Sequence, residues 1–296
     1  MADLLPLVTL VGEAWDDYGL VDSGNGRKLE RYGRFRFIRP EPQAMWAPAL
    51  PQSEWDAADG EFIPASDDDG GGRWYYNKPV PQEGWPLGWR ETRFTAQCTP
   101  FRHLGFFPDM APLWDWLRGQ IADKPDPAFL HLFGYTGGGS QALAAAGASV
   151  THVDASKKSV SQARENAALA GMADKPVRWI VDDAGKFTAR EVRREKRYDA
   201  ILLDPPKFGR GPTGERWQLE EGLAPLLADC RQLLDADSRA LFLTVYAVRM
   251  SALAIGELLN QLFADLPGKV ECGELAVREE ARGLLLPTAI FARWSR

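Results

Sequence analysis

The sequence is poor in the residues that cross-link small secreted proteins or bind metals. It holds three cysteines and three histidines in 296 residues, and Cys98, Cys230 and Cys272 lie far apart with no CxxC pair. These spacings support neither a disulfide framework nor a zinc site, and we expect no bound metal. A chain without structural disulfides fits a reducing compartment, so the predicted location is the cytoplasm.

Long hydrophobic runs and an excess of positive charge are missing too. The longest early apolar run, residues 4–11, is too short to cross a bilayer, and we expect no membrane role. The net charge of -6 gives no general attraction to nucleic acid, so any RNA contact has to come from a local basic patch. With 45% hydrophobic and 26% charged residues, the chain is globular, with room for one large domain and a small one.

The first hundred residues differ from the remainder. They hold six of the eleven tryptophans, and short alternating runs between proline- and glycine-rich turns predict a small β-rich domain over residues 1–96. From near Thr95 onward strands alternate with helices, which predicts a parallel sheet with helical crossovers over residues 97–296. The expected fold class is α/β, with a doubly wound, mostly parallel Rossmann-like sheet and the small N-terminal domain.

One local basic patch lies in the predicted small domain. Residues 27–39 contain six arginine or lysine residues and one acid, Glu30, interleaved with aromatic rings. Such a mixture can bind phosphates and stack on bases, so Arg34 and Arg36 are candidate RNA contacts of this domain. The alternative is an edge strand whose arginines simply face water.

A glycine-rich turn follows the first strand expected in the parallel sheet, residues 129–133. Gly137, Gly139 and Ala142 match the pattern G-x-G-x-x-A between this strand and a predicted helix at residues 141–146. Glycines at these places let the backbone turn tightly and approach a ligand closely.

Acidic residues end the next two strands. Residues 149–153 lead to Asp154, where a carboxylate binds ribose hydroxyls, although Asp154 could instead be part of a cap with Ser156. Residues 177–181 lead to Asp182 and Asp183, which are placed for an adenine amino group. The alternative is that one of the two acids is structural, and its position at the strand end favours Asp182 as the ligand. Together the three strand ends predict an adenosine pocket, which NAD and S-adenosylmethionine fit equally well.

The fourth strand, residues 198–203, ends in Asp204-Pro-Pro-Lys-Phe208. Because proline has no N–H, two in a row stop the strand and leave nearby carbonyls able to accept other hydrogen bonds. Asp204 and the Pro205 carbonyl could hold a substrate N–H, Phe208 could stack on a base, and Lys207 could meet a phosphate or face solvent. The alternative is an ordinary end of the strand at a turn. A dehydrogenase has no need for a carboxylate followed by two prolines at this strand end, so the element favours a methyltransferase over a dehydrogenase.

The strings FGYTGGGS at residues 133–140, VDAS at 153–156 with Asn166 in the following helix, and LLDPPKF at 202–208 resemble the class I S-adenosylmethionine-dependent methyltransferases. The resemblance is specifically to the branch that methylates cytosine and guanine in large-subunit ribosomal RNA, and it covers about Thr95 to the C terminus. It implies S-adenosyl-L-methionine as cofactor and RNA as substrate. It also implies cofactor contacts from Phe133, Tyr135, Thr136 and Ala155.

Residues 102–109 are similar to the aromatic loop that precedes the cofactor domain in these enzymes. By that resemblance, Phe106 and Asp109 would close over the methionine end of the cofactor. The other interpretation is a hydrophobic staple before a helix at residues 110–117.

The sequence departs from the family members that methylate carbon 5 of cytosine. They carry a nucleophilic cysteine after the fifth strand, whereas residues 240–246 contain none, which favours methylation of a base nitrogen. The turn-rich residues 209–217 are expected to form a mobile loop over the site, with Arg210 and Arg216 as candidate phosphate contacts. A protein or small-molecule methyltransferase, a dinucleotide-dependent oxidoreductase and a non-catalytic RNA-binding module remain alternatives, and the oligomeric state is not predicted.

Overall fold

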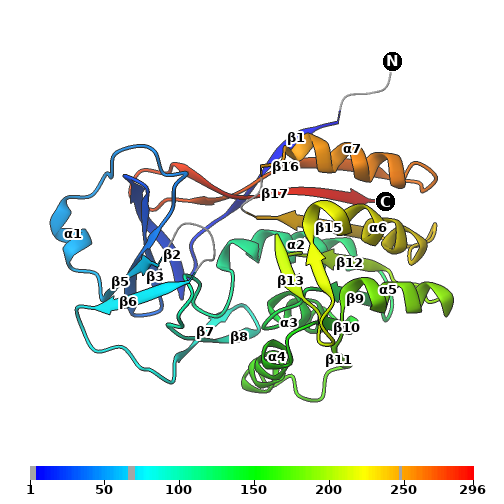
Figure 1. The fold of residues 1–296 in the computed structure, drawn as a ribbon, viewed down its shortest axis with the longest axis horizontal. Coiled ribbons are helices and arrows are strands. Elements are labelled where there is room, and N and C mark those ends of the chain that lie inside the picture. The colour runs from blue at the N-terminus through cyan, green and yellow to red at the C-terminus, as the bar shows by residue number, and fades with distance from the viewer. Residues whose placement is uncertain (1–4, 66–70, 247–248) are drawn as a thin grey trace. The chain divides into compact units, whose positions relative to one another are not determined.

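The computed structural model describes residues 5–65, 71–246 and 249–296, which divide into two compact units. The large unit comprises the described residues up to Leu10, Pro112–Leu275 and Ala289–Arg296. The small unit comprises Val11–Ala111 and Ala276–Thr288. Figure 1 shows the elements of both units in chain order.

The large unit is organised around a sheet of eight strands in the order β1-β16-β17-β15-β12-β9-β10-β11. Its strands are β1 (Leu7–Gly12), β9 (Ala128–Leu132), β10 (Ser149–Asp154), β11 (Val177–Val181), β12 (Ala200–Leu203), β15 (Ala240–Val245), β16 (Lys269–Arg278) and β17 (Leu285–Ser295). Strands β11, β10, β9, β12 and β15 run parallel, and β17 joins β15 in the antiparallel sense. The chain winds outward from β9 to β11 and then returns to the other side of β9 as β12, so the predicted doubly wound α/β class is confirmed.

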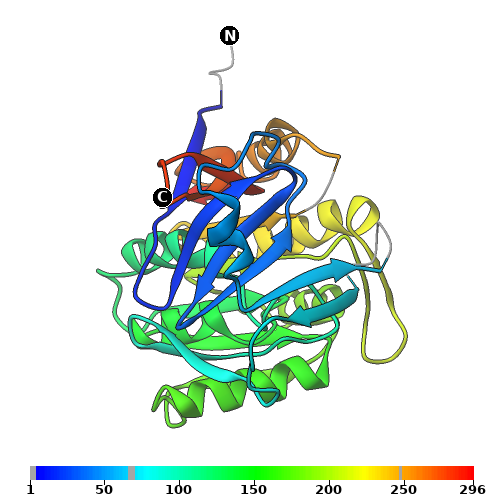
Figure 2. The same cartoon turned by 90° about the vertical axis from the view of Figure 1, so that its left-hand side faces the viewer.

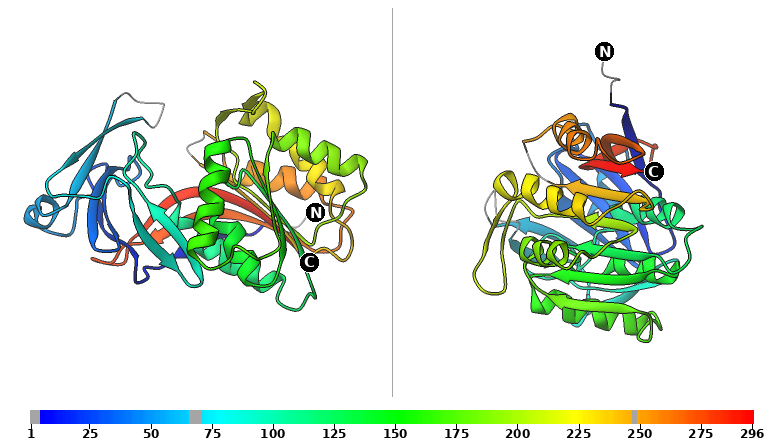
Figure 3. Two further views of the ribbon diagram at one scale, coloured as in Figure 1. Left: turned by 90° about the horizontal axis from the view of Figure 1, so that it is seen from below. Right: turned by 90° about the vertical axis from the view of Figure 1, so that its right-hand side faces the viewer.

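Helices precede, connect and follow the parallel strands. They are α2 (Ala111–Gln120), α3 (Gly138–Ala145), α4 (Lys157–Leu169), α5 (Ala184–Arg193), α6 (Leu219–Gln232) and α7 (Ala252–Leu262). Strands β12 and β15 are buried at every position. Helices cover both faces of a parallel sheet, so its strands consist mostly of apolar residues. In Figure 3 the helices are seen flanking these strands.

The small unit contains a five-stranded sheet in the order β2-β3-β4-β5-β6 and a separate pair, β7-β8. The bounds are β2 (Tyr18–Gly24), β3 (Arg27–Tyr32), β4 (Phe35–Pro40), α1 (Gln52–Asp56), β5 (Gly60–Pro64), β6 (Gly72–Tyr76), β7 (Trp85–Trp89) and β8 (Thr92–Ala96). A short 3-10 helix, η1 (Pro108–Met110), follows. The sheet is seen in blue and cyan in Figure 2, and it confirms the predicted β-rich character of the N-terminal region.

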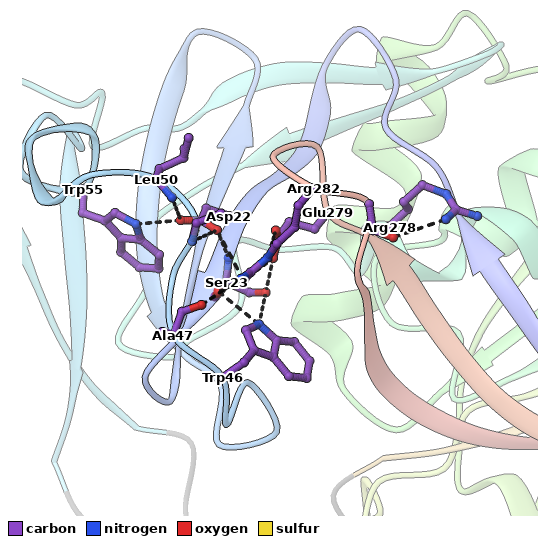
Figure 4. Close-up of polar contacts among 11 residues, drawn as sticks. Asp22, Ser23, Trp46, Ala47, Leu50, Trp55, Arg278, Glu279 and Arg282 are labelled. Carbon is purple, nitrogen blue, oxygen red and sulfur yellow. Dashed lines mark hydrogen bonds and ion pairs between the residues drawn. The ribbon is translucent and has the colours of Figure 1, made fainter.

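The contacts divide the chain differently from the expected split at residues 96 and 97. Residues 97–111 and the distant segment 276–288 belong to the small unit, and residues up to Leu10 belong to the large one. A buried polar cluster accounts for the segment 276–288, because Glu279 accepts a hydrogen bond from Ser23 at 2.5 Å and Arg282 donates to the Ser23 carbonyl at 2.8 Å. Figure 4 shows these residues together with Asp22, whose carboxylate accepts from the Trp55 indole at 3.0 Å. Contacts 256 residues apart in the sequence leave no local signal.

Two further findings concern the described part of the chain. No helix there is long and apolar enough to cross a membrane. Within the same residues, no group of three or more histidine, cysteine, aspartate or glutamate side chains is arranged to hold a metal ion.

Candidate active site

Four chemically active segments end four neighbouring strands of the large unit. The glycine-rich turn follows β9, Asp154 ends β10, Asp182 follows β11 and Asp204 follows β12, and these strands lie in the order β12-β9-β10-β11. The chain reverses its winding direction at β9, and ligands of open α/β sheets bind at the carboxyl ends of the strands at such a point. The four segments singled out in the sequence therefore lie at neighbouring strand ends of one sheet.

The turn after β9 has a constrained backbone. Phe133 and Tyr135 adopt left-handed conformations, with φ of 55° and 47°, which cost energy for residues other than glycine. Gly137 has a φ of 86°, and a side chain there would bring a Cβ within 2.9 Å of Ala163. Asn166 of α4 is buried and donates its amide to the Thr136 carbonyl at 3.0 Å. The turn is thus held from outside, which keeps its backbone amide groups in fixed directions.

Asp154 holds the same turn from the end of β10. Its carboxylate accepts hydrogen bonds from the backbone N–H of Tyr135 at 2.9 Å and of Ser156 at 2.8 Å. Ser156 is the N-cap of α4, as predicted, and accepts from Ser159 N–H. Burial raises the pKa of Asp154 although both backbone hydrogen bonds oppose the shift. Each carboxylate oxygen accepts one backbone bond and retains a lone pair for a further donor.

A buried polar cluster lies beneath the turn. Ser140 of α3 is 2.9 Å from Nδ1 of His131 and 2.9 Å from Nδ1 of His152, and all three side chains are buried. Burial lowers the pKa of His131 to about 3, and burial followed by the neighbouring His131 lowers that of His152 well below its usual value. Both rings are therefore neutral groups of the core. Ser140 as the bridging residue was missed, since its position in a glycine-rich turn suggests only flexibility.

The two acids after β11 have different partners. Asp183 is the N-cap of α5 and accepts from the backbone N–H of Lys186 at 2.9 Å. Asp182 accepts from the N–H of Asp183 at 2.9 Å and forms an ion pair with Arg190. The capping bond gives Asp183 a structural task, which favours Asp182 as the residue that faces a ligand.

The segment after β12 combines a fixed carboxylate with an exposed ring. Thr244 of β15 is buried and donates to Asp204 at 2.6 Å, which sets the direction of that carboxylate. Pro205 is buried, whereas Lys207 and Phe208 are exposed, the ring to 61%. The Lys207 ammonium lies 5.2 Å from the centre of the Phe208 ring, a cation–π contact.

Residues 208–218 form a hairpin where a mobile loop was expected. Strands β13 (Phe208–Arg210) and β14 (Arg216–Gln218) pair in antiparallel register. Trp217 anchors the hairpin, because its indole donates to the Pro206 carbonyl at 2.6 Å and its ring lies 5.0 Å from that of Phe133. Sequence reasoning missed this anchor, since the segment is otherwise made of turn residues.

Four of the remaining predicted residues belong to the small unit. Phe106 is buried there, stacked on Phe94 with ring centres 4.8 Å apart, and Asp109 is buried in η1. Arg36 pairs with Glu54 at 3.0 Å, and the Arg34 guanidinium lies 4.8 Å from the centre of the Phe35 ring. Ala155 of the large unit is half-buried beside Asp154. Binding of cofactor or substrate by these five residues, as by the other predicted site residues, stays a prediction.

A family model and known proteins match this chain. The model of S-adenosylmethionine-dependent methyltransferases matches residues 38–220, more than half of the chain. The ribosomal RNA large subunit methyltransferase K/L of Methylococcus capsulatus is 34% identical over 168 residues, which are 56% of this chain and 21% of the relative. The ribosomal RNA large subunit methyltransferase I of Aeromonas salmonicida is 34% identical over 112 residues, 38% of this chain and 26% of the relative. The match thus spans about a quarter of either relative's length.

A solved structure matches nearly the whole chain. The crystal structure of the S-adenosylmethionine-dependent methyltransferase from Agrobacterium tumefaciens has a TM-score of 0.91 and 44% sequence identity, and the match covers 98% of this chain and 95% of that one. This similarity includes both the eight-stranded sheet and the small unit.

Proposed function

The chain belongs to the S-adenosylmethionine-dependent methyltransferases, and from that premise we propose that it transfers the methyl group to a base nitrogen of ribosomal RNA in the cytoplasm. The names of the similar proteins from Methylococcus and Aeromonas support the RNA class. The observation that carries the proposal is the end of β12, where Thr244 fixes the Asp204 carboxylate next to the exposed Phe208 ring.

The strand ends fit the groups of the cofactor. Asp154 is a half-buried carboxylate whose remaining lone pairs suit ribose hydroxyls, and Asp182 suits the adenine amino group. At Gly139 a Cβ would come within 2.9 Å of Leu202 and 3.0 Å of His131, so glycine at this position lets α3 pack closely on β9 and β12. We assign the cofactor to this edge of the sheet, with Phe133, Tyr135, Thr136 and Gly137 forming the turn beneath it.

The chemistry asks the protein mainly for positioning. S-adenosylmethionine supplies a methyl group on sulfur that is already activated. The Asp204 carboxylate and the Pro205 carbonyl would accept hydrogen bonds from the base and orient the reacting nitrogen, while Phe208 stacks on its face. A base in a duplex has to be unpaired or flipped to reach this position.

The cysteines support a nitrogen acceptor. Methylation of carbon 5 of cytosine needs a thiolate nucleophile. Burial raises the pKa of Cys230 and of Cys272, and it raises that of Cys98 to about 12, so these thiols stay protonated near neutral pH.

The test is methyl transfer to RNA from a strain that lacks the gene. The purified protein is incubated with methyl-labelled S-adenosylmethionine and total RNA or protein, and labelled nucleosides are identified after digestion. D204A should lose at least about a hundredfold in activity, as expected when a positioning group is removed, and the exposed control D174A should keep it. T244V should lower kcat with little change in cofactor affinity. Label at cytosine carbon 5, or only in protein, would contradict the proposal.

A further inference from the structure

Two arginines face each other across the β13–β14 hairpin. The register pairs Arg210 with Arg216, and both side chains are exposed. Residues directly opposite in an antiparallel pair project to the same side, with Cβ atoms about 5 Å apart, and like charges in this arrangement are destabilising. A hairpin that keeps this pair presents two positive charges at one spot.

The hairpin has no acid available to neutralise the pair. Its one acid, Glu215, forms an ion pair with Lys186 and accepts from the backbone N–H of Thr213 at 2.9 Å. Within residues 5–65, 71–246 and 249–296, neither Arg210 nor Arg216 has an acidic side chain within ion-pair distance. The anion that would complement the two guanidinium groups therefore comes from outside the described chain.

The alternation of side chains separates the two faces of the hairpin. Trp217 lies opposite Gly209 and packs inward, against the ring of Phe133 and against α6 at Gly222. The other face carries Phe208, Arg210, Arg216 and Gln218, because side chains of a strand alternate with a period of two. In the right panel of Figure 3 the hairpin and its turn project from the large unit as a narrow loop.

We propose that the outer face of this hairpin binds single-stranded RNA, with the Arg210–Arg216 pair on the backbone phosphates next to the base that Phe208 stacks on. The inference rests on the proposed function and adds the residues that bind the strand. An exposed ring flanked by cations is the combination that binds single strands without reading their sequence. Guanidinium groups suit phosphate oxygens because their donors form a planar fork.

The test measures binding of a fluorescein-labelled 12-residue oligouridylate by anisotropy over a range of salt concentrations. For R210Q/R216Q, the slope of log K against log salt should become shallower by about 0.7 to 1.4, because each phosphate contact on a single strand contributes about 0.7. F208A should weaken binding at least about fivefold through lost stacking. The control R164Q/R193Q removes two exposed helical arginines and should leave the slope unchanged.

Further measurements separate the possible failures. Thermal unfolding of R210Q/R216Q should match that of the unmodified protein, since the replaced side chains are exposed. An unchanged slope in this variant, or no binding of the oligouridylate by the unmodified protein, would overturn the inference. Equal loss of binding to polyglutamate would assign the pair to acidic protein instead. RNA methylation unaffected by R210Q/R216Q would leave the proposed function standing, whereas a lowered slope without any RNA methylation would overturn only the proposed function.

Discussion

In the part of the chain that the structure describes, two pairs of arginines face each other across antiparallel strands, and acidic side chains there neutralise one pair. In the small unit Arg31 lies opposite Arg36, and in the large unit Arg210 lies opposite Arg216. Arg31 has Glu280 at 3.5 Å and donates to three carbonyls, and Arg36 has Glu54 at 3.0 Å. The same local pattern is thus structural where distant acids reach it and available for a ligand where none do.

The small unit extends this neutralisation into its core. Glu30 accepts from Arg39 at 2.7 Å and from Tyr18 at 2.9 Å, and all three side chains are buried. Lys28 lies 3.3 Å from Glu41, and Arg27 lies 3.4 Å from Glu61. Most charges of the stretch 27–39 thus have acidic partners, and its strands β3 and β4 lie inside their sheet, so the alternative of an edge strand with water-facing arginines is wrong. The hairpin β13–β14 is the stronger candidate for RNA.

The largest expected effect is on the buried side of this comparison. E30A leaves the Arg39 guanidinium buried without its carboxylate, which should destabilise the protein by about 3–5 kcal/mol. Urea unfolding followed by tryptophan fluorescence measures the change, since Trp85 donates to the Tyr32 carbonyl within this unit. A loss below about 1 kcal/mol would mean that the network contributes no more than a surface pair.

The next largest effect is expected from acid, which should destabilise the two units to different extents. Burial lowers the pKa of His131 to about 3 and lowers that of His152, both in the large unit, while burial and nearby arginines lower that of His103 in the small unit to about 4. Each ring takes up a proton more readily in the unfolded chain than in the folded one. The free energy of unfolding therefore keeps its full value above about pH 6.5 and falls as the pH drops toward the folded pKa. The slope for each histidine approaches about 1.4 kcal/mol per pH unit.

Between pH 6.5 and 5.5 the large unit should therefore lose about 2 kcal/mol, twice the loss of the small unit. Hydrogen exchange of amides in β9 and β10, compared with amides in β3 and β4, measures both. The variant H131N should halve the loss in the large unit. Equal losses in the two units would contradict the assignment of two neutral buried rings to the large unit.

A third change would place an acidic residue on the outer face of the hairpin. Q218E places a carboxylate on the same face as Arg216 and should lower RNA affinity by about fivefold, or 1 kcal/mol, while stabilising the fold by a few tenths of a kcal/mol. The salt dependence of oligouridylate binding and a thermal melt report the two effects. The replacement E220Q in the first turn of α6 is the control of opposite sign. Unchanged affinity would mean that the outer face does not contact the strand.

The smallest effect is expected for the exposed pair of the small unit. E54A removes the partner of Arg36 where the side chains are 47% and 40% exposed, so it should change stability by no more than about 0.5 kcal/mol. It is the matched control for E30A, since both remove a carboxylate from an arginine. A loss as large as that of E30A would show that burial does not distinguish the two pairs.

Local chemistry made much of the fold predictable. The Ser156 cap of α4 and the range of β11 were predicted correctly, because capping residues and apolar runs can be recognised from adjacent residues. The carboxyl ends of β9 to β12 followed, since parallel strands place those ends at one edge.

Contacts between residues far apart in the sequence could not be predicted. The residues next to Asp183 in the sequence do not show whether its carboxylate caps a helix or binds a ligand. The residues next to Arg36 do not indicate that it pairs with Glu54. The hairpin β13–β14 depends on Trp217 reaching Pro206 and Phe133, so it read as a loop. Ion pairs between distant residues form only in the folded chain. The spacing of charged residues in the sequence therefore does not show which charged side chains are exposed.

The joining of segment 276–288 to the small unit bears on the order in which the protein matures during synthesis. Ser23 and its partner Glu279 are 256 residues apart, so a ribosome adding about 5–20 residues per second makes the partner about 10–50 s later. Until then, the polar side chains of Asp22 and Ser23 lack their later partners. The buried polar contacts around Ser23 are thus completed only after the segment that carries Glu279 has been translated.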